Sequence, residues 1–110
     1  MSKTLIQDES IAWTDLGGGI QRKIMAHNDE MMIVKVAFAT GGIGAMHSHP
    51  HTQASYIESG VFKLTIGDET SILNAGDAYF VPSEVEHGAE CLEAGVLVDV
   101  FSPTRKDFLS

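Results

Sequence analysis

The sequence has one cysteine, one tryptophan and three prolines among its 110 residues. The single cysteine, Cys91, cannot form a disulfide within the chain, so the fold must rest on packing or on a bound metal. No apolar stretch approaches the ~20 residues of a membrane-spanning helix, and residues 1–10 lack the apolar core of a signal peptide. We therefore expect a cytoplasmic protein that is neither exported nor inserted in a membrane.

Basic residues are also scarce, and they are scattered along the chain. Seven Lys and Arg residues stand against 15 Asp and Glu residues, which gives a formal net charge of -8. A protein that binds phosphates needs a run or patch of Lys and Arg, and no such run occurs. We expect neither nucleic acid nor an anionic membrane as a partner.

The chain does contain apolar sequence that is interrupted at short intervals by turn-forming residues. Hydrophobic residues make up 44% of the chain and charged residues 20%, and the length suits one domain spanning residues 1–110. Short runs rich in Val, Ile, Phe and Thr are separated by turn signals at Gly17–Gly19, Gly41–Gly42, Gly60, Gly67–Asp68, Asn74–Gly76, Pro82 and Gly95. Such spacing is typical of an all-β sandwich or barrel.

Two of the apolar runs show the alternation of half-buried strands. In Val34–Phe38 and Phe62–Ile66, residues of one parity are large and apolar while the others are mixed. No window has a sustained apolar stripe at helical period, and Pro103–Leu109 has room for one turn at most. The sequence therefore predicts an antiparallel β fold with little helix.

Three of the five histidines lie within His47–His51. Positions two apart on an extended chain project from the same face about 7 Å apart, so His47 and His49 can bind one ion together. Gln53 lies four residues beyond His49, and His87 follows a second turn. The alternative is a polar loop whose histidines face water, which the clustering makes the weaker interpretation.

The other two histidines are assigned differently. His27 lies in the polar stretch Ala26–Glu30, which resembles a hairpin turn, so we expect it at the surface. His51 is expected at the rim of the site, and a role as an alternative ligand stays open.

Two motifs carry a resemblance to a known family. Gly41–Gly60 reads G-x5-H-x-H-x3-Q-x6-G and Gly76–His87 reads G-x5-P-x4-H, which in this order resemble the two motifs of the cupin superfamily. Gln53 stands where a Glu is usual, Glu84 where a glycine is usual and Cys91 where an asparagine is usual. The resemblance implies a double-stranded β-helix, or jelly-roll barrel, that holds a metal inside. The implied ligands are His47, His49, Gln53 and His87.

The implied ligand set has consequences for the metal and the substrate. Three neutral imidazoles and one amide oxygen leave the double charge of the ion uncompensated, which favours an anionic substrate. Imidazole suits Zn, Ni, Cu and Fe alike, so the donor set does not fix the metal. We expect one divalent ion, with Ni, Zn, Mn and Fe as candidates.

The run Val96–Phe101 is apolar except for one acid. Leu97, Asp99 and Phe101 share a face of the expected strand. A carboxylate between large apolar residues is partly desolvated, which makes Asp99 a candidate for acid–base chemistry, although a surface ion pair or a turn cap is the alternative. Arg105 is either a solvated tail charge or a planar fork that binds a substrate carboxylate.

The whole chain also resembles the KdgF-type cupins, which act on unsaturated uronates released from pectin and alginate. The segments that carry this resemblance are Leu16–Ile24, Met32–Val36, His47–Gln53 and Val98–Phe108. It implies that Asp99, Phe101 and Arg105 line the site beside the metal.

The resemblance implies a metal-dependent enzyme that opens the ring of a 4,5-unsaturated uronate and converts it to the linear keto form, 5-keto-4-deoxyuronate. Asp99 would move the proton and Arg105 would hold the carboxylate, while Phe101 and Tyr56 would form apolar walls. The alternatives are a cupin dioxygenase that uses the same metal site, a non-catalytic protein that binds a sugar acid, and a storage protein. Exposed sheet edges are commonly covered by a second copy, so we expect a homodimer.

Overall fold

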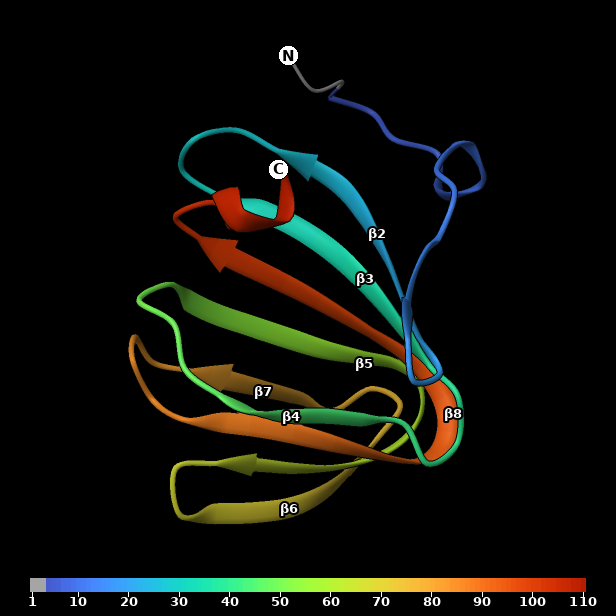
Figure 1. Ribbon diagram of the computed structural model, residues 1–110, viewed down its shortest axis with the longest axis vertical. Helices are drawn as coiled ribbons and strands as arrows, with labels where there is room; N and C mark the ends of the chain where they lie inside the picture. Colours follow the sequence, from blue (N-terminus) through green and yellow to red (C-terminus); the bar gives the residue numbers. More distant parts are fainter. Residues whose placement is uncertain (1–3) are drawn as a thin grey trace.

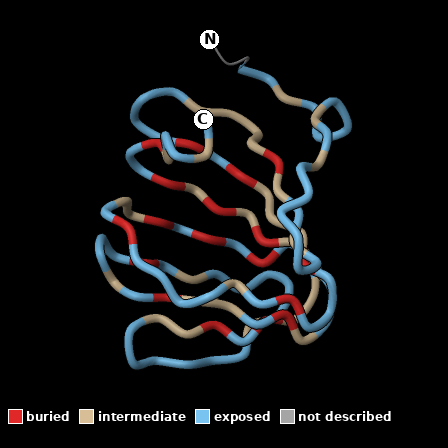
Figure 2. Tube along the Cα trace, in the orientation of Figure 1, coloured by how far each residue is buried: buried red, intermediate tan, exposed pale blue. Residues whose placement is uncertain are grey.

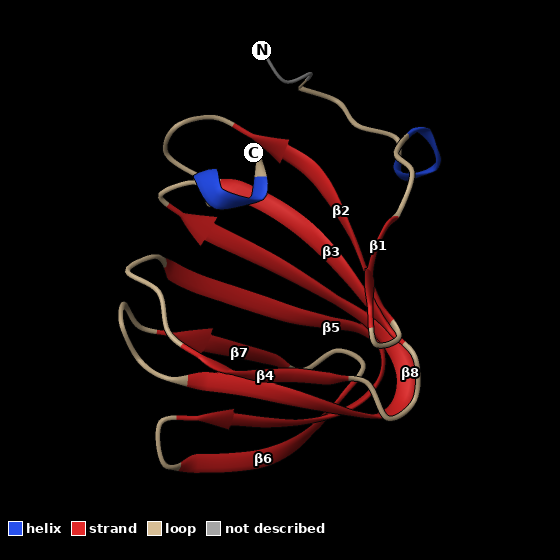
Figure 3. Cartoon of the chain, in the orientation of Figure 1, coloured by secondary structure: helices blue, strands red, loops and turns tan. Residues whose placement is uncertain are grey.

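The computed structural model describes residues 4–110, so the first three residues of the expected domain and N-terminus lie outside the described part. Figures 1 and 3 show a curled antiparallel sheet with almost no helix. The elements are η1 (Asp8–Ser10), β1 (Thr14–Gly17), β2 (Ile20–His27), β3 (Met32–Phe38), β4 (Ile43–His47), β5 (Thr52–Ile66), β6 (Glu69–Asn74), β7 (Ala78–Val81), β8 (His87–Ser102) and η2 (Lys106–Phe108). None of the helices within residues 4–110 has the length and apolar character needed to cross a membrane. The expected all-β jelly roll is confirmed.

Two long strands, β5 and β8, run through both layers of the fold and join them. The first half of β5 and the second half of β8 pair with each other between β7 and β3. The other halves of β5 and β8 pair between β6 and β4. Each long strand bends where it passes from one layer to the other, on the right of Figure 1. The sheet thereby folds back on itself and encloses one interior.

The bend corrects two of the turns expected from the sequence. Gly60 and Gly95 lie inside β5 and β8, at positions where the register between the two strands shifts. A Cβ atom on Gly95 would lie 2.0 Å from the carbonyl oxygen of Ser59, and one on Gly60 would lie 2.6 Å from that of Glu93. Glycine is needed at both positions because the two backbones come into contact there, whereas a local sequence pattern cannot distinguish such a bend from a turn.

Buried residues alternate with less buried ones along the strands (Figure 2), and the buried residues form two apolar clusters in the interior. One cluster lies toward the bend and comprises Phe38, Ile57, Phe62, Leu64, Cys91 and Leu97. A second cluster consists of Met32, Val34 and Phe101, against which Phe108 of η2 packs. Cys91 is only 1% exposed, so it serves as a small apolar core residue, and burial raises the pKa of its thiol.

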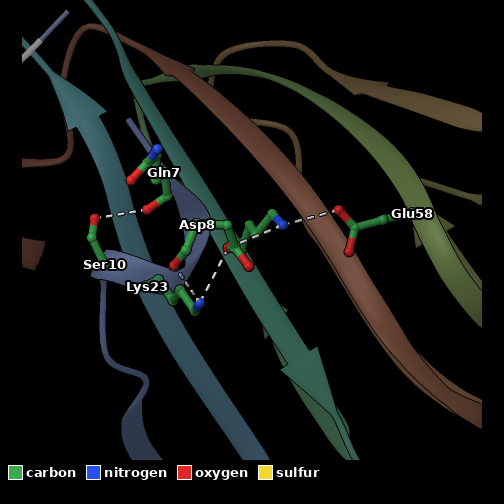
Figure 4. Close-up of polar contacts among 6 residues, drawn as sticks. Gln7, Asp8, Ser10, Lys23 and Glu58 are labelled. Carbon is green, nitrogen blue, oxygen red and sulfur yellow. Dashed lines mark hydrogen bonds and ion pairs between the residues drawn. The ribbon is translucent and has the colours of Figure 1, made fainter. Parts of the chain in front are cut away.

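A band of ion pairs fastens the N-terminal segment to the outside of the sheet (Figure 4). The Oδ1 atom of Asp8 lies 3.1 Å from Lys23 Nζ and 3.2 Å from Lys35 Nζ. Lys35 also lies 3.1 Å from Glu58 Oε1 on β5. Hydrogen bonds from the two lysines lower the pKa of Asp8. The segment before β1 therefore covers part of the outer face of β2 and β3.

The close approach at the bend gives a direct test of the fold. Gly95→Ala is expected to destabilise the protein by about 2 kcal/mol or more, because a Cβ atom would overlap the Ser59 backbone. Gly44→Ala is the matched control, since its Cβ atom would find no neighbour nearer than 3.7 Å. Urea unfolding of both variants measures the difference, and equal midpoints would contradict the contact at the bend.

Candidate metal centre

Strand pairing brings the predicted histidines together. His47 at the end of β4 pairs directly with His87 at the start of β8, and their ring centroids are 4.3 Å apart. His49 lies in the connection that follows β4, with its ring centroid 4.8 Å from that of His87. One ring nitrogen of each histidine lies within 4.8 Å of those of the others, and His49 and His87 are buried while His47 is exposed. The three side chains could hold a metal ion.

Backbone carbonyl groups orient all three rings in the same way. The Nδ1 atom of each ring lies 2.8 to 2.9 Å from the carbonyl oxygen of a residue two positions away. The ring–carbonyl pairs are His47 with Ala45, His49 with His51, and His87 with Val85. A carbonyl oxygen only accepts hydrogen bonds, so Nδ1 carries the proton and Nε2 of the neutral ring presents a lone pair. This is the tautomer that binds a metal through Nε2.

Gln53 completes the cluster from the neighbouring strand. Its Oε1 atom lies 3.0 Å from His49 Nε2, and its amide nitrogen donates to Ser55 Oγ over 2.9 Å. The Ser55 hydroxyl donates its own proton to Asp99 Oδ1 over 2.6 Å, so it must accept from the Gln53 amide. The oxygen of Gln53 is thus directed at the histidines.

Two observations show that these donor atoms fit a cation. The lone pairs of His49 Nε2 and Gln53 Oε1 face each other at 3.0 Å, which is favourable when a cation contacts both atoms. The Nε2 atom of His87 is buried and has no hydrogen-bond partner among residues 4–110. Burial, with smaller contributions from His47, His49 and Arg105, lowers the pKa of His87 and so favours the neutral, metal-binding ring.

Glu84 occupies the position at which the cupin motif has a glycine. Its φ angle is 68°, and it is the one residue other than glycine with a positive φ in the described part of the chain. Its amide nitrogen donates to the carbonyl oxygen of His49 over 2.8 Å. The loop before His87 therefore keeps the left-handed backbone that explains the usual glycine, and it holds His49 in place.

Asp99 lies inside the barrel and is buried like His49 and His87. Strand register places it in one row with Val34, Ser55 and Tyr79. Burial raises the pKa of Asp99 to about 6, against the opposing effect of hydrogen bonds from Ser55, Gln53 and Tyr79. Burial and the charge of Asp99 in turn raise the pKa of the Tyr79 hydroxyl. Asp99 is only 7% exposed, so it is neither a turn cap nor part of a surface ion pair.

Phe101 lies beside His49, and Arg105 in the C-terminal segment lies beside Phe101. The Phe101 ring packs edge-to-face on His49 with a centroid distance of 5.7 Å, and the guanidinium carbon of Arg105 lies 5.1 Å from the Phe101 centroid. Arg105 donates through Nε and Nη2 to the two oxygens of Asp107, over 3.1 and 2.8 Å. Its side chain is 12% exposed, and its charge contributes to lowering the pKa of His51 and His87. Arg105 is therefore not a solvated tail charge.

The structure corrects the position expected for Tyr56. Gln53, Ser55 and Ile57 point inward along β5, so Tyr56 has the opposite parity and is 50% exposed on the outer face. It therefore does not form a wall of the site. The sequence analysis missed Ser55 and Tyr79. Ser55 shares the parity of Gln53, which was an available signal, but Tyr79 reaches the site only through the pairing of β7 with β5.

The remaining histidines lie outside the cluster. His51 contributes its carbonyl oxygen to His49, and its ring lies 5.4 Å from the His49 ring, which suits the rim position expected for it. Burial and the charge of Arg105 lower the pKa of His51. His27 ends β2 beside the expected turn and is half-buried, whereas we expected it at the surface.

The fold and the inward cluster define a class of protein, a small jelly-roll barrel with a candidate metal centre. The chain belongs to the cupin family, since the model of the Cupin domain matches residues 34–101. It is 46% identical to the pectin degradation protein KdgF of Dickeya dadantii over 99% of this chain and 100% of that protein.

Solved structures agree with this assignment. An RmlC-like cupin from Shewanella frigidimarina has a TM-score of 0.95 and 41% identity, covering 97% of this chain and 96% of that chain. KdgF from Halomonas sp. has a TM-score of 0.92 and 37% identity, covering 96% of this chain and 99% of the other. The likeness therefore extends over the whole chain.

Substitution of the buried His87 tests the metal centre through the stability that a bound metal adds. Wild-type protein is expected to gain about 2.7 kcal/mol of stability from Zn or Ni at one hundred times the dissociation constant. His87→Ala should abolish this gain because it removes the buried lone pair of Nε2. His27→Ala, at the end of β2, is the control and should retain it. Thermal unfolding with and without the ion measures the effect, and an unchanged gain in His87→Ala would exclude His87 as a ligand.

Proposed function

We propose that this protein catalyses the ring opening and ketonisation of 4,5-unsaturated uronates, the products of pectin or alginate lyases, to 5-keto-4-deoxyuronate. The similarity to KdgF proteins along the whole chain supports this reaction. The observation that carries the proposal is the contact of Gln53 Oε1 with the histidine cluster, together with the hydrogen bonds from the Gln53 amide to Ser55 and from Ser55 to the buried Asp99.

The reaction is an isomerisation and requires no redox step. The anomeric hydroxyl loses its proton, the bond between C1 and the ring oxygen breaks, and C1 becomes an aldehyde. The ring oxygen becomes the oxygen of an enolate, which takes up a proton at C4 and leaves a ketone at C5. One proton therefore moves from an oxygen to a carbon, which is a task for a positioned acid–base group.

His47, His49, Gln53 and His87 are proposed to hold one divalent ion, with Ni, Zn, Mn and Fe as candidates. When bound, this ion supplies Lewis-acid polarisation of substrate oxygens. Because all four donors are neutral, the site keeps a positive charge that attracts a carboxylate-bearing sugar.

The protein residues supply orientation and proton transfer. Asp99 is the proposed proton carrier, and its carboxylate is held in one direction by Ser55. Phe101 gives the sugar an apolar wall next to His49. Arg105 has two of its N–H groups bound to Asp107, which fixes the plane of the guanidinium group and leaves the Nη1 hydrogens for a substrate carboxylate.

Substitution of Asp99, the proposed proton carrier, and of Arg105, the proposed carboxylate-binding residue, tests the reaction. Asp99→Asn is expected to reduce kcat by about 100-fold or more, and Arg105→Ala to raise KM about tenfold or more. The readout is the decay of the ultraviolet absorbance of a pectate or alginate lyase digest, corrected for the uncatalysed reaction. Lys106→Ala, next to Arg105, is the control for lost charge.

The same assay separates this reaction from oxygen-dependent chemistry. Zn- or Ni-loaded protein is expected to remain active under argon. Activity of Asp99→Asn close to that of the wild type would remove Asp99 from the mechanism, and a strict requirement for oxygen would favour a dioxygenase.

We also propose that the protein forms a homodimer through the outer face of the sheet formed by β3, β8, β5 and β7. Strand register aligns Ile33, Val100, Ala54 and Phe80 in one row on this face. Ile33 is 38%, Tyr56 50% and Phe80 57% exposed, so the face presents apolar surface that a second copy can cover. Sedimentation equilibrium should give twice the chain mass of 11.8 kDa, and Phe80→Asp should lower it. A wild-type monomer would contradict the proposal.

A further inference from the structure

Arg22 has no role in the site as described so far, although it lies in one of the segments that carry the family resemblance. It pairs with Val36 on β3, and Val36 pairs with Leu97 on β8. Directly paired residues share a face of the sheet, and Leu97 is 3% exposed inside the barrel. The Arg22 side chain therefore projects from the inner face of β2 and is half-buried.

The guanidinium group of Arg22 contacts the C-terminal segment, which contains Arg105 and Phe108. The guanidinium carbon of Arg22 lies 4.0 Å from the centroid of the Phe108 ring, and that of Arg105 lies 4.2 Å from the same centroid. The two cationic groups are therefore no further apart than the sum of these distances. The Phe108 ring packs edge-to-face on Phe101 with a centroid distance of 5.7 Å, and Phe101 packs on His49, which links this pair of arginines to the histidine cluster.

The charges of the groups around the Phe108 ring do not cancel. Asp107 accepts two hydrogen bonds from Arg105, and its negative charge also acts on Arg22. Burial and the charge of Arg105 lower the pKa of Arg22, against the opposing effect of Asp107. Two guanidinium groups and one carboxylate leave one positive charge at a partly desolvated position, which is stabilised by a second anion.

We infer that Arg22 is a second substrate-binding residue, which acts with Arg105 to bind the carboxylate of a sugar acid beside the Phe108 ring. The Phe108 ring supports both guanidinium groups through cation–π contacts. Asp107 engages one edge of Arg105, so the anion approaches from the side of Nη1 and of Arg22. The inference rests on the proposed function for the identity of the substrate, but it depends on the anion alone for binding.

Binding of a stable sugar acid tests this role separately from catalysis. Isothermal titration calorimetry would compare galacturonate with its uncharged methyl ester, using metal-loaded wild type and Arg22→Gln. Arg22→Gln is expected to weaken galacturonate binding about tenfold and to leave binding of the ester unchanged. Arg22→Lys keeps a charge and should recover part of the loss. Lys63→Gln, which removes the same charge from an exposed position on β5, should have no effect.

Kinetics with the unsaturated uronate give a second readout. Arg22→Gln should raise KM about tenfold and change kcat by less than about twofold, because the contact is equal in the ground and transition states. Equal weakening of acid and ester would mean that Arg22 merely supports the fold around Phe108, and it would overturn the inference. Unchanged galacturonate binding in Arg22→Gln, or no preference of the wild type for the acid, would overturn it as well. If galacturonate binds as expected and no ring opening occurs, the proposed function fails while the role of Arg22 stands.

Discussion

The site depends on one constraint, the convergence of unprotonated donor atoms in a closed interior. Three backbone carbonyls each accept a hydrogen bond from the Nδ1–H group of an imidazole, and this leaves the Nε2 lone pairs facing inward. Ser55 applies the same constraint to Gln53, because a hydroxyl that donates to Asp99 can only accept from the amide nitrogen. Lone pairs held this close together are stable only with a cation or an added proton between them. The position of the proposed proton carrier, Asp99, follows from the same hydrogen bonds.

The long strands β5 and β8 make this convergence possible. Because both strands pass through the bend, they bring His87 from one layer and Gln53, Asp99 and Phe101 from the other into a single interior. The glycines at the bend allow the two backbones to touch, so the two layers come together there. The C-terminal helix η2 carries Phe108, whose ring packs on Phe101. The arginines that we propose for carboxylate binding, on β2 and just before η2, both contact Phe108.

The sequence predicted features that depend on local spacing. Residues near one another in the chain determine the histidine pair His47 and His49 and the strands around Val34–Phe38 and Phe62–Ile66. They also determine the face that Leu97, Asp99 and Phe101 share. The prediction that Tyr56 lines the site was wrong because periodicity shows which residues share a face but not which face is inside. The prediction of turns at Gly60 and Gly95 was wrong because glycine serves both a bend within a strand and a turn between strands. Tyr79 and Arg22 lie near the site only through strand pairing, which no local pattern encodes.

Anomalous diffraction from crystals grown with Zn or Ni tests the convergence of donor atoms most directly. One peak is expected, about 2.0–2.3 Å from the Nε2 atoms of His47, His49 and His87 and from Oε1 of Gln53. The Gln53 amide nitrogen should still point to Ser55. A peak bound through Nδ1 atoms, or one elsewhere in the molecule with these four side chains unchanged, would contradict the proposed centre.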